Sequence, residues 1–475
     1  MHKFSHFIDG TEVVIDGQEY FQTSSPHSGE PVAQIALGDA ATVDLSVQSN
    51  LRAFDQWRKT DPLERGRIMV DIARNIRSRI ARLSAMEAEQ TGKTAWQGPA
   101  ELEAAAQYFE YYGGLTTLPI GEVVETGQGF HGYTTRVPFG VVGVITPWNL
   151  PMNQGARAIA PALAVGNVVT SKPSEYTSGT AVELARIAIE SGLPKGVLNV
   201  VLGNGIDCGA PLVKHDAVRK VCFTGSVRAG REIGRIAADR IIPLTLELGG
   251  KSANIIFADA DFDAAIPASV AAFATNAGQV CTAGTRLLVE RSAYDEVVAR
   301  MVEAAKQMKL GSSEDAHVGA ITTPDQLARV KSYFDIAKQD GAKLELGGTE
   351  AMGDVPAVGQ YAPVTIYSGV LPDMRIAQEE VFGPVLSIIA FDSEEDAIAI
   401  ANGTDFGLAA GLWTNDLGRA HRVAGELEAG YISVNHYSPS PFLPFGGFKN
   451  SGYGREKGME ALHHYCQTKS VNIKL

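Results

Sequence analysis

The sequence predicts an α/β protein in which a doubly wound parallel sheet is joined to a second α/β domain and a small exposed β segment. From about residue 139, short β-branched runs alternate with helical stretches, and the spacing leaves the dozen or more residues that a parallel crossover needs. The 475 residues also suffice for about three domains or sub-domains at ~150 residues each.

The composition narrows the functional class. Asp and Glu (54) outnumber Lys and Arg (41), and a net charge of −13 argues against nucleic acid or an anionic membrane as the main partner. The longest uncharged apolar stretch, residues 264–274, contains Pro267 and is too short to span a bilayer. Four scattered cysteines do not form a disulfide framework or a C-x-x-C zinc motif. We therefore expect a cytoplasmic protein without a metal.

The amino-terminal part predicts short strands and then helices. Gly10, Gly17 and Pro26 break the first forty residues into strands and turns. A helical apolar stripe follows at Val43, Val47, Leu51 and Phe54. The next helix should begin at Asp61-Pro62, which combines an acidic N-cap with proline in the first turn.

Five apolar runs predict a Rossmann-like sheet, namely residues 140–146, 166–172, 197–203, 220–226 and 243–250. A second α/β region follows over 250–448, with helices expected at 294–308 and 324–340 and a strand at 385–391. The residue pattern over 125–138 alternates as in an exposed hairpin. Residues 470–475 predict one more strand, which would have no partner in its own domain. Such a sheet edge favours pairing with another chain.

Two glycine-rich turns are candidate phosphate sites. Gly203–Gly209 follows a strand, but its G-x-G-x-x-x-G spacing is one residue longer than the dinucleotide fingerprint. The segment Phe223-Thr224-Gly225-Ser226 places backbone amides and a hydroxyl at the start of a helix. Ser226 would either bind a phosphate there or simply cap the helix. Lys172 and Glu175 lie at the end of another strand. The Glu175 carboxylate would accept hydrogen bonds from ribose hydroxyls and disfavour NADP. Alternatively, the two side chains are only a solvated pair at the start of a helix.

Three further residues could carry chemistry. Cys281 lies among small residues, with glycines on both sides. It is either a buried packing residue or a nucleophile, because the glycines would let a ligand approach the backbone closely. Glu247 ends an otherwise apolar strand, so it is either paired for structural reasons or partly desolvated as a general base. Asn149 follows a β run and offers an amide donor, or simply forms a turn.

Together these segments resemble the aldehyde dehydrogenase superfamily, of the hydrolytic type that does not acylate coenzyme A. The resemblance covers nearly the whole chain through PWNLP (147–151), KPSE (172–175), FTGS with Gly230 (223–230), LELGGK (246–251), NAGQVC (276–281), EEVFGPV (379–385) and PFGGFKNSG (444–452). Val227, Arg228 and Ala229 depart from the acidic residue and valine that many members carry after Gly-Ser.

The resemblance implies roles for residues. Cys281 would attack the aldehyde, Asn149 and the Cys281 amide would hold the oxyanion, and Glu247 would activate water to release the acid. NAD, favoured over NADP, would contact Thr146, Pro147, Trp148, Lys172, Glu175, Gly205, Gly225, Ser226, Glu380 and Phe382. Residues 1–120 with 139–249 would form the NAD-binding domain, 250–448 the catalytic domain, and 121–138 with 449–475 the segments that build a homodimer or homotetramer.

The resemblance also suggests a substrate pocket, lined by Leu150, Met152, Asn153, Arg157, Val280, Thr282, Phe442 and Phe445 and by the loop 436–442, which includes Pro439. This apolar and aromatic set favours a hydrophobic or aromatic aldehyde. Arg157 keeps a semialdehyde open, although the second arginine of semialdehyde enzymes is replaced by Thr275. Acyl transfer to coenzyme A is less favoured, because Glu247 is present.

Overall fold

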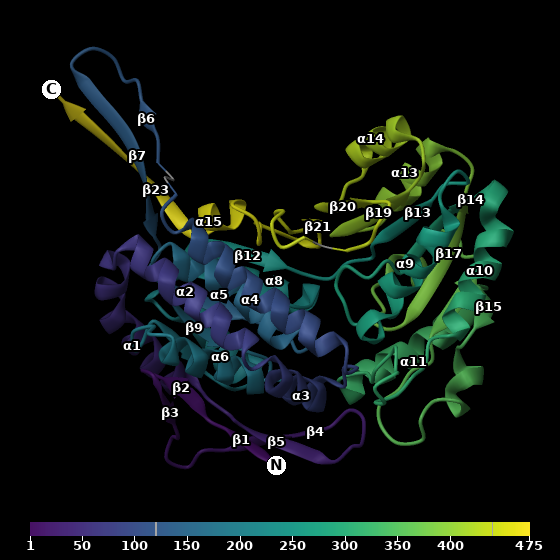
Figure 1. Ribbon diagram of the computed structural model, residues 1–475, viewed down its shortest axis with the longest axis horizontal. Coiled ribbons are helices and arrows are strands. Elements are labelled where there is room, and N and C mark those ends of the chain that lie inside the picture. The colour runs from purple at the N-terminus through teal and green to yellow at the C-terminus, as the bar shows by residue number, and fades with distance from the viewer. Residues whose placement is uncertain (119–120, 439) are drawn as a thin grey trace.

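An eight-stranded sheet forms the centre of the first of two lobes in the computed structural model, which describes residues 1–118, 121–438 and 440–475 (Figure 1). The strand order is β22-β12-β11-β8-β9-β10-β2-β3. Its five middle strands are mutually parallel: β8 (Val141–Ile145), β9 (Val168–Lys172), β10 (Leu198–Val200), β11 (Val218–Thr224) and β12 (Leu244–Glu247). The chain moves outward from β8 to β10 and then returns to β11 on the other side, so the predicted doubly wound sheet is confirmed.

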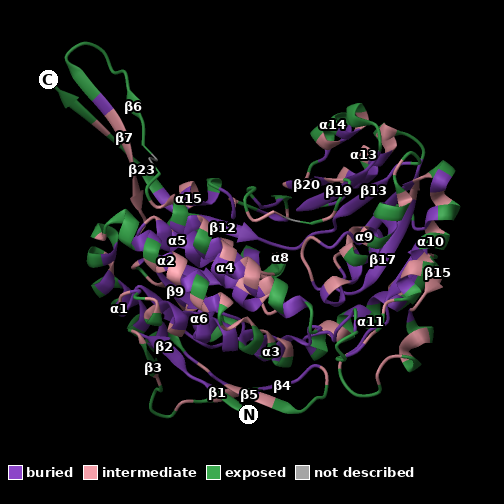
Figure 2. Cartoon of the chain, in the orientation of Figure 1, coloured by how far each residue is buried: buried purple, intermediate pink, exposed green. Residues whose placement is uncertain are grey.

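The parallel strands form because apolar β-branched runs are covered on both faces. Every residue of β8 and β9 is buried, and Figure 2 shows the central strands of both large sheets in the buried colour. The surrounding helices are α1 (Ala40–Lys59), α2 (Pro62–Arg77), α3 (Ile80–Thr91), α4 (Gln97–Leu115), α5 (Pro151–Ala164), α6 (Gly179–Glu190), α7 (Ala210–Lys214) and α8 (Val227–Arg240). Asp61 caps α2 as predicted, accepting a hydrogen bond from the Leu63 amide.

The ends of the chain extend this sheet in ways that the sequence did not indicate. Strands β2 (His6–Ile8) and β3 (Thr11–Val13) continue it antiparallel beyond β10. On the opposite edge, β22 (Gly452–Tyr453) pairs with β12. A separate three-stranded sheet contains β1 (His2–Phe4), β5 (Pro31–Ala36) and β4 (Tyr20–Ser24).

The second lobe contains a seven-stranded sheet that is parallel except for its first strand. Its order is β15 (Lys343–Leu346), β16 (Thr365–Ser368), β17 (Val385–Phe391), β14 (Arg286–Glu290), β13 (Ala253–Ile256), β19 (Ala409–Trp413) and β20 (Tyr431–Val434). The larger helices are α9 (Phe262–Ala274), α10 (Tyr294–Lys306), α11 (Pro324–Gln339), α13 (Glu394–Asn402) and α14 (Leu417–Glu426). The predicted helices at 294–308 and 324–340 and the strand at 385–391 are confirmed.

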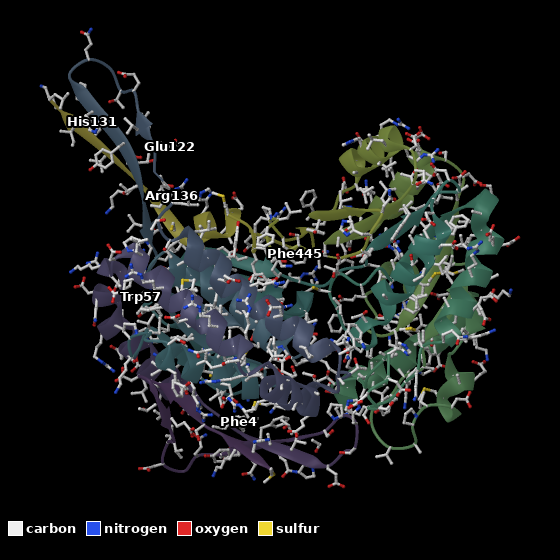
Figure 3. All side chains as sticks on the ribbon, viewed as in Figure 1. Phe4, Trp57, Glu122, His131, Arg136 and Phe445 are labelled. Carbon is white, nitrogen blue, oxygen red and sulfur yellow. The ribbon has the colours of Figure 1, made fainter. Side chains whose placement is uncertain are left out.

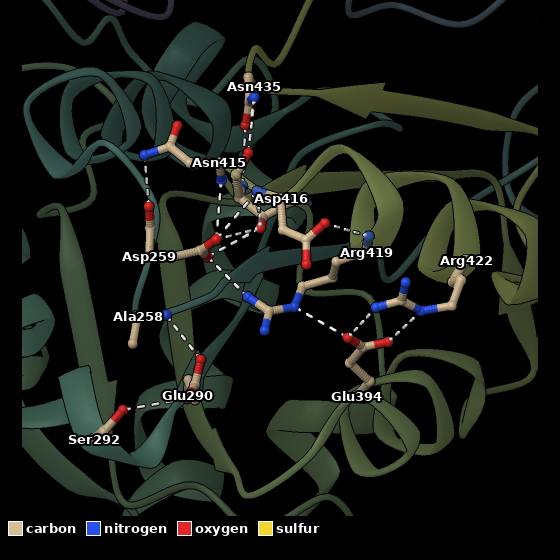
Figure 4. A network of polar contacts seen from close by, with 11 residues as sticks. Ala258, Asp259, Glu290, Ser292, Glu394, Asn415, Asp416, Arg419, Arg422 and Asn435 are labelled. Carbon is tan, nitrogen blue, oxygen red and sulfur yellow. Dashed lines mark hydrogen bonds and ion pairs between the residues drawn. The ribbon is translucent and has the colours of Figure 1, made fainter.

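An ion-pair network fixes the outer helices of this lobe (Figure 4). Arg419 on α14 lies 2.9 Å from Asp259 and 3.1 Å from Glu394, and Arg422 lies 2.7 Å from the same glutamate. Asp259 also accepts hydrogen bonds from the Thr414 hydroxyl and the Asn415 amide. The network joins α13, α14 and the loop after β13 at the surface.

A three-stranded arm projects from the first lobe (Figure 1). It contains β23 (Cys466–Lys474), β7 (Phe130–Pro138) and β6 (Val123–Val124), with β23 and β7 antiparallel over nine residue pairs. The strand predicted at 470–475 is part of the longer β23, which pairs with β7 and not with a strand of either large sheet. The outer edge of β23 still has no strand beside it in the described chain.

The proposed terminal segment 449–475 begins too early. β21 (Phe448–Lys449) pairs with β18 (Phe406–Gly407), β22 belongs to the large sheet, and α15 (Glu460–His464) packs on α5. Only Cys466–Lys474 lies in the arm, because the apolar residues before it are used in the core. The predictions that involve residues 119, 120 and 439 fall outside the described residues. Among the described helices, none combines the length and the apolar character needed to cross a bilayer.

Candidate active site

A cavity of about 800 Å³ is lined by residues of both lobes and contains most of the predicted catalytic and cofactor residues. The first lobe contributes the carboxyl ends of β8, β11 and β12, the edge at which parallel sheets bind ligands. The second lobe contributes residues of α11 and of the segment before β17. The predicted residues in its lining are Pro147, Trp148, Asn149, Gly225, Ser226, Glu247, Cys281, Glu380 and Phe382.

Cys281 follows a tightly folded turn at the end of α9. Asn276 and Ala277 both have φ of +52°, which is unusual for residues with a Cβ atom. At Gly250 an added Cβ would lie 2.7 Å from the Cys281 carbonyl oxygen, so this position requires glycine. Burial raises the pKa of the Cys281 thiol to about 11, although the nearby Arg157 and Lys457 act in the opposite direction. At neutral pH the resting side chain is therefore a thiol.

Asn149 is held beside the cysteine loop by its own amide. Its side-chain nitrogen donates a hydrogen bond of 2.9 Å to the Gln279 carbonyl, and its backbone carbonyl accepts one of 3.4 Å from Asn276. An amide has two N–H groups, so one remains to donate to a ligand. The side chain is buried and oriented before any ligand binds.

Glu247 is a desolvated carboxylate at the end of β12. Neither of its oxygens has a hydrogen-bond partner among the described residues. An added Cβ at Gly446 would lie 2.8 Å from one of them, so a glycine is needed to make room for the carboxylate. Burial, and then repulsion from Glu456, raise the pKa of Glu247 well above its usual value. A carboxylate with a raised pKa is suited to accept a proton from water.

Arg157 and Glu456 form a buried ion pair behind Glu247. Glu456 also accepts a hydrogen bond of 2.9 Å from the Cys222 thiol, and Arg157 donates a longer one, 3.4 Å, to Thr224. Arg157, predicted for the substrate pocket, is thus paired within the protein and does not line this cavity. Because an unpaired buried charge is costly, this pairing stabilises Arg157.

The residues predicted for a pyrophosphate and a ribose line one wall of the cavity. Ser226 is exposed and caps α8, accepting a hydrogen bond of 3.2 Å from Ala229. Glu380 accepts a hydrogen bond of 3.0 Å from the Gly250 amide, and burial raises its pKa to about 7. Phe382 packs edge-to-face on Trp148 with ring centroids 5.6 Å apart. This wall therefore combines a helix start, a carboxylate and an aromatic platform.

The other predicted cofactor residues lie further along the same sheet edge, outside the cavity lining. Lys172 is buried at the end of β9, 3.7 Å from Glu175, and burial lowers its pKa. The Thr146 amide donates a hydrogen bond to the Lys172 carbonyl. Gly205 begins a turn, Gly205–Gly209, whose last glycine packs against the Lys172 side chain. The structure thus brings these four residues into a second, neighbouring group.

None of the eight predicted substrate residues lines the cavity. Phe445 belongs to an apolar cluster with Leu408, Ala409 and Tyr431 that packs against Cys281. The remaining predicted residues occupy other environments: Leu150 precedes α5, Met152 is fully buried, Asn153 donates to the Glu101 carbonyl, Val280 and Thr282 flank the cysteine, and Phe442 is exposed against Tyr111. Met152 is packed in the core, and Phe442 faces solvent.

Several cavity residues were missed by the sequence reasoning. Arg231 lies on the first turns of α8 together with Arg228, which is noted above only as a departure from the family pattern, and only its position after Gly225-Ser226 could have indicated it. Gln326, Arg329 and Tyr333 come from α11, an ordinary amphipathic helix without any local signal. They reach the site because the two lobes face each other there.

Comparison with known proteins agrees with this geometry. The model of the family described as "Aldehyde dehydrogenase family" matches residues 14–471. A betaine aldehyde dehydrogenase of Bacillus subtilis is 39% identical over 471 residues, 98% of this chain and 96% of that protein. A mutant indole-3-acetaldehyde dehydrogenase of P. syringae, in complex with NAD+ and IAA, matches with a TM-score of 0.96 at 39% identity over 100% of this chain and 97% of that one. The betaine aldehyde dehydrogenase of Staphylococcus aureus, in complex with NAD+, matches with a TM-score of 0.95 at 34% identity, over 99% of this chain and 94% of that one.

Proposed function

The chain belongs to the aldehyde dehydrogenase family, and from that premise we propose that it oxidises an aldehyde to the carboxylic acid with NAD as cofactor. The observation that supports this proposal most strongly is the meeting of Cys281, Glu247 and Asn149 in one cavity, whose other walls carry Ser226 and Glu380. This meeting supports the roles of nucleophile, base and oxyanion donor for the three residues, beside a wall that would suit a dinucleotide.

The cavity residues fit the cofactor. The amides at the start of α8 suit a pyrophosphate, Glu380 offers an acceptor for ribose hydroxyls, and Phe382 with Trp148 offers an aromatic surface. Glu175 at the end of β9 would accept hydrogen bonds from the second ribose and repel a 2′-phosphate, which supports NAD over NADP. Residues 1–120 and 139–249 would then form the cofactor domain and 250–448 the catalytic domain.

The chain's own residues account for the covalent steps. The Cys281 sulfur adds to the aldehyde carbon, its thiol proton leaves to solvent, and the free N–H of Asn149 stabilises the oxyanion of the thiohemiacetal. When bound, NAD supplies the acceptor for the hydride that leaves, so that a thioester on Cys281 remains. Glu247 takes a proton from water, and the resulting hydroxide attacks the thioester. The carboxylic acid departs as the proton on Glu247 passes to the Cys281 sulfur and restores the thiol. Retention of Glu247 supports hydrolysis over acyl transfer to coenzyme A.

The finer assignments are also proposals. Phe445 and its apolar neighbours beside Cys281 support an aldehyde with a hydrophobic or aromatic body, and a semialdehyde is the alternative. The unpartnered outer edge of β23 supports self-association of the arm into a homodimer or homotetramer. All four cysteines are free thiols, which supports a reducing, cytoplasmic compartment.

A panel of aldehydes scored by NADH absorbance at 340 nm tests the function. We expect the wild type to oxidise at least one hydrophobic aldehyde with NAD, and the Cys281→Ala variant to bind NAD without turnover. NADH formation that persists in this variant would refute the nucleophile. A wild type that is inactive on the whole panel would refute the function.

A further inference from the structure

Lys457 has a backbone conformation that lysine rarely adopts. Its φ is +58°, in the left-handed region, and Gly458 follows with +56°. The preceding residue holds it there, because Glu456 and Phe445 exchange two backbone hydrogen bonds of 2.6 and 2.7 Å. A glycine would fit this position without strain, and such strained residues cluster at functional sites. The lysine side chain therefore calls for an explanation of its own.

The Lys457 side chain is largely buried beside an aromatic ring. The residue is only 6% exposed, and its nitrogen lies 4.7 Å from the centroid of the Phe445 ring. It makes no hydrogen bond or ion pair with the described residues. Arg157 faces the same ring at 5.3 Å, but its charge is matched by Glu456. Of these two cations, only Lys457 lacks a direct ion pair, although Glu456 and Glu247 are near enough to raise its pKa.

This ammonium borders the reacting cysteine outside the proposed cofactor cavity. Phe445 belongs to the cluster that packs against Cys281, while neither Phe445 nor Lys457 lines the cavity. Figure 3 places Phe445 between the two lobes. The side of Phe445 and Lys457 therefore adjoins Cys281 through this apolar cluster and is separate from the proposed cofactor cavity.

We propose that Lys457 is an anion-recognising residue of the aldehyde site, and that the preferred substrate is an aldehyde that carries a carboxylate beyond a hydrophobic or aromatic body. The inference rests on the proposed function and specifies its substrate class. The Phe445 ring packs on the body of the aldehyde, and the carboxylate neutralises the buried ammonium. Burial, and then repulsion from Arg157, lower the pKa of Lys457 to about 8, while Cys281, Glu456 and Glu247 act in the opposite direction.

The test compares 4-formylbenzoate with 4-formylbenzamide, two aldehydes of the same shape that differ in charge. In the wild type we expect kcat/KM for the carboxylate to exceed that for the amide by at least tenfold. Lys457→Met should remove this preference, mainly through KM for the carboxylate, while kcat/KM for the amide stays within about threefold. Lys457→Arg should retain most of the preference.

Lys449→Met is a matched control. Lys449 also has a positive φ, +52°, but it is exposed and pairs with Glu428, so its replacement should leave the preference unchanged. A second measurement needs no variant: benzoate should inhibit the wild type more strongly than benzamide, competitively with the aldehyde.

Three results would overturn the inference: a wild type without the preference, a Lys457→Met enzyme that keeps it, or equal losses on both aldehydes. The last would show that the cation acts on Cys281 rather than on the substrate. Equal inhibition by benzoate and benzamide would also overturn it, even if the methionine variant failed to fold. Failure of the proposed function is distinct, because then neither aldehyde would yield NADH in the wild type.

Discussion

Replacing Gly249 by alanine tests whether Glu380 binds the cofactor. An alanine Cβ would lie 2.3 Å from one Glu380 oxygen and 2.8 Å from its carboxyl carbon. Comfortable contact between such atoms begins near ~3.4 Å, so the carboxylate must retreat by about 1 Å. This retreat breaks the hydrogen bond of 3.0 Å that Glu380 accepts from the Gly250 amide.

The expected effect falls on cofactor affinity rather than on folding. The obstructing atoms belong to the end of a flexible side chain, so the backbone at Gly249 need not move. Hydrogen bonds to a charged group are worth ~1.5–3 kcal/mol, so their loss at the ribose should raise KM for NAD roughly 10- to 150-fold. We expect kcat to change less, because Cys281 and Glu247 are not displaced.

Initial rates of NADH formation at saturating aldehyde, with NAD varied, measure this effect. Gly234→Ala is the control, since Gly234 on α8 has no heavy atom within 4 Å of an added Cβ and should keep the wild-type KM. If Gly249→Ala folds with a wild-type circular dichroism spectrum and keeps the wild-type KM for NAD, Glu380 does not hold the cofactor.

Three other predictions concern the catalytic pair and the arm. Glu247→Gln should release about one equivalent of NADH per site in stopped flow and then stall at the thioester, because no base activates water; steady turnover at the wild-type rate would point to another base. Alkylation of Cys281 by iodoacetamide, followed by mass spectrometry of the peptide, should accelerate about tenfold per pH unit from pH 7 to 10, because only the thiolate reacts and burial raises its pKa to about 11; a plateau below pH 9 would contradict this. Ending the chain after Tyr465 removes β23 and should lower the mass measured by light scattering; an unchanged mass would show that the arm does not join subunits.

The strands of the doubly wound sheet were predictable because each one carries its own signal. The apolar runs at β8, β9 and β11 are complete within a few residues and are buried on both faces, so no distant partner is needed to recognise them. The catalytic candidates Cys281 and Glu247 stood out for a related reason. Each is a reactive side chain in a local setting of small or apolar residues, and the structure places both in one cavity.

The features that depend on distant pairing could not be predicted. Arg157 was interpreted from its position alone, whereas its partner Glu456 lies 299 positions later. The edge strands β2 and β3, the pairing of β22 with β12, and the α11 wall of the cavity likewise arise from contacts between remote segments. Lys457 has no local signal, because its left-handed backbone is imposed by the bridge between Phe445 and Glu456.

The pairing of β7 with β23 also sets an order of events during synthesis. Pro138 and Cys466, which face each other at the base of the arm, are separated by 328 positions. At roughly 5–20 residues per second, a ribosome needs about 16–66 s to make the second strand after the first. During that interval β7 has only the two residues of β6 as a strand neighbour. An exposed strand of this kind is open to pairing with other nascent chains, so a polyribosome is a setting in which both correct assembly and aggregation of the arm can begin.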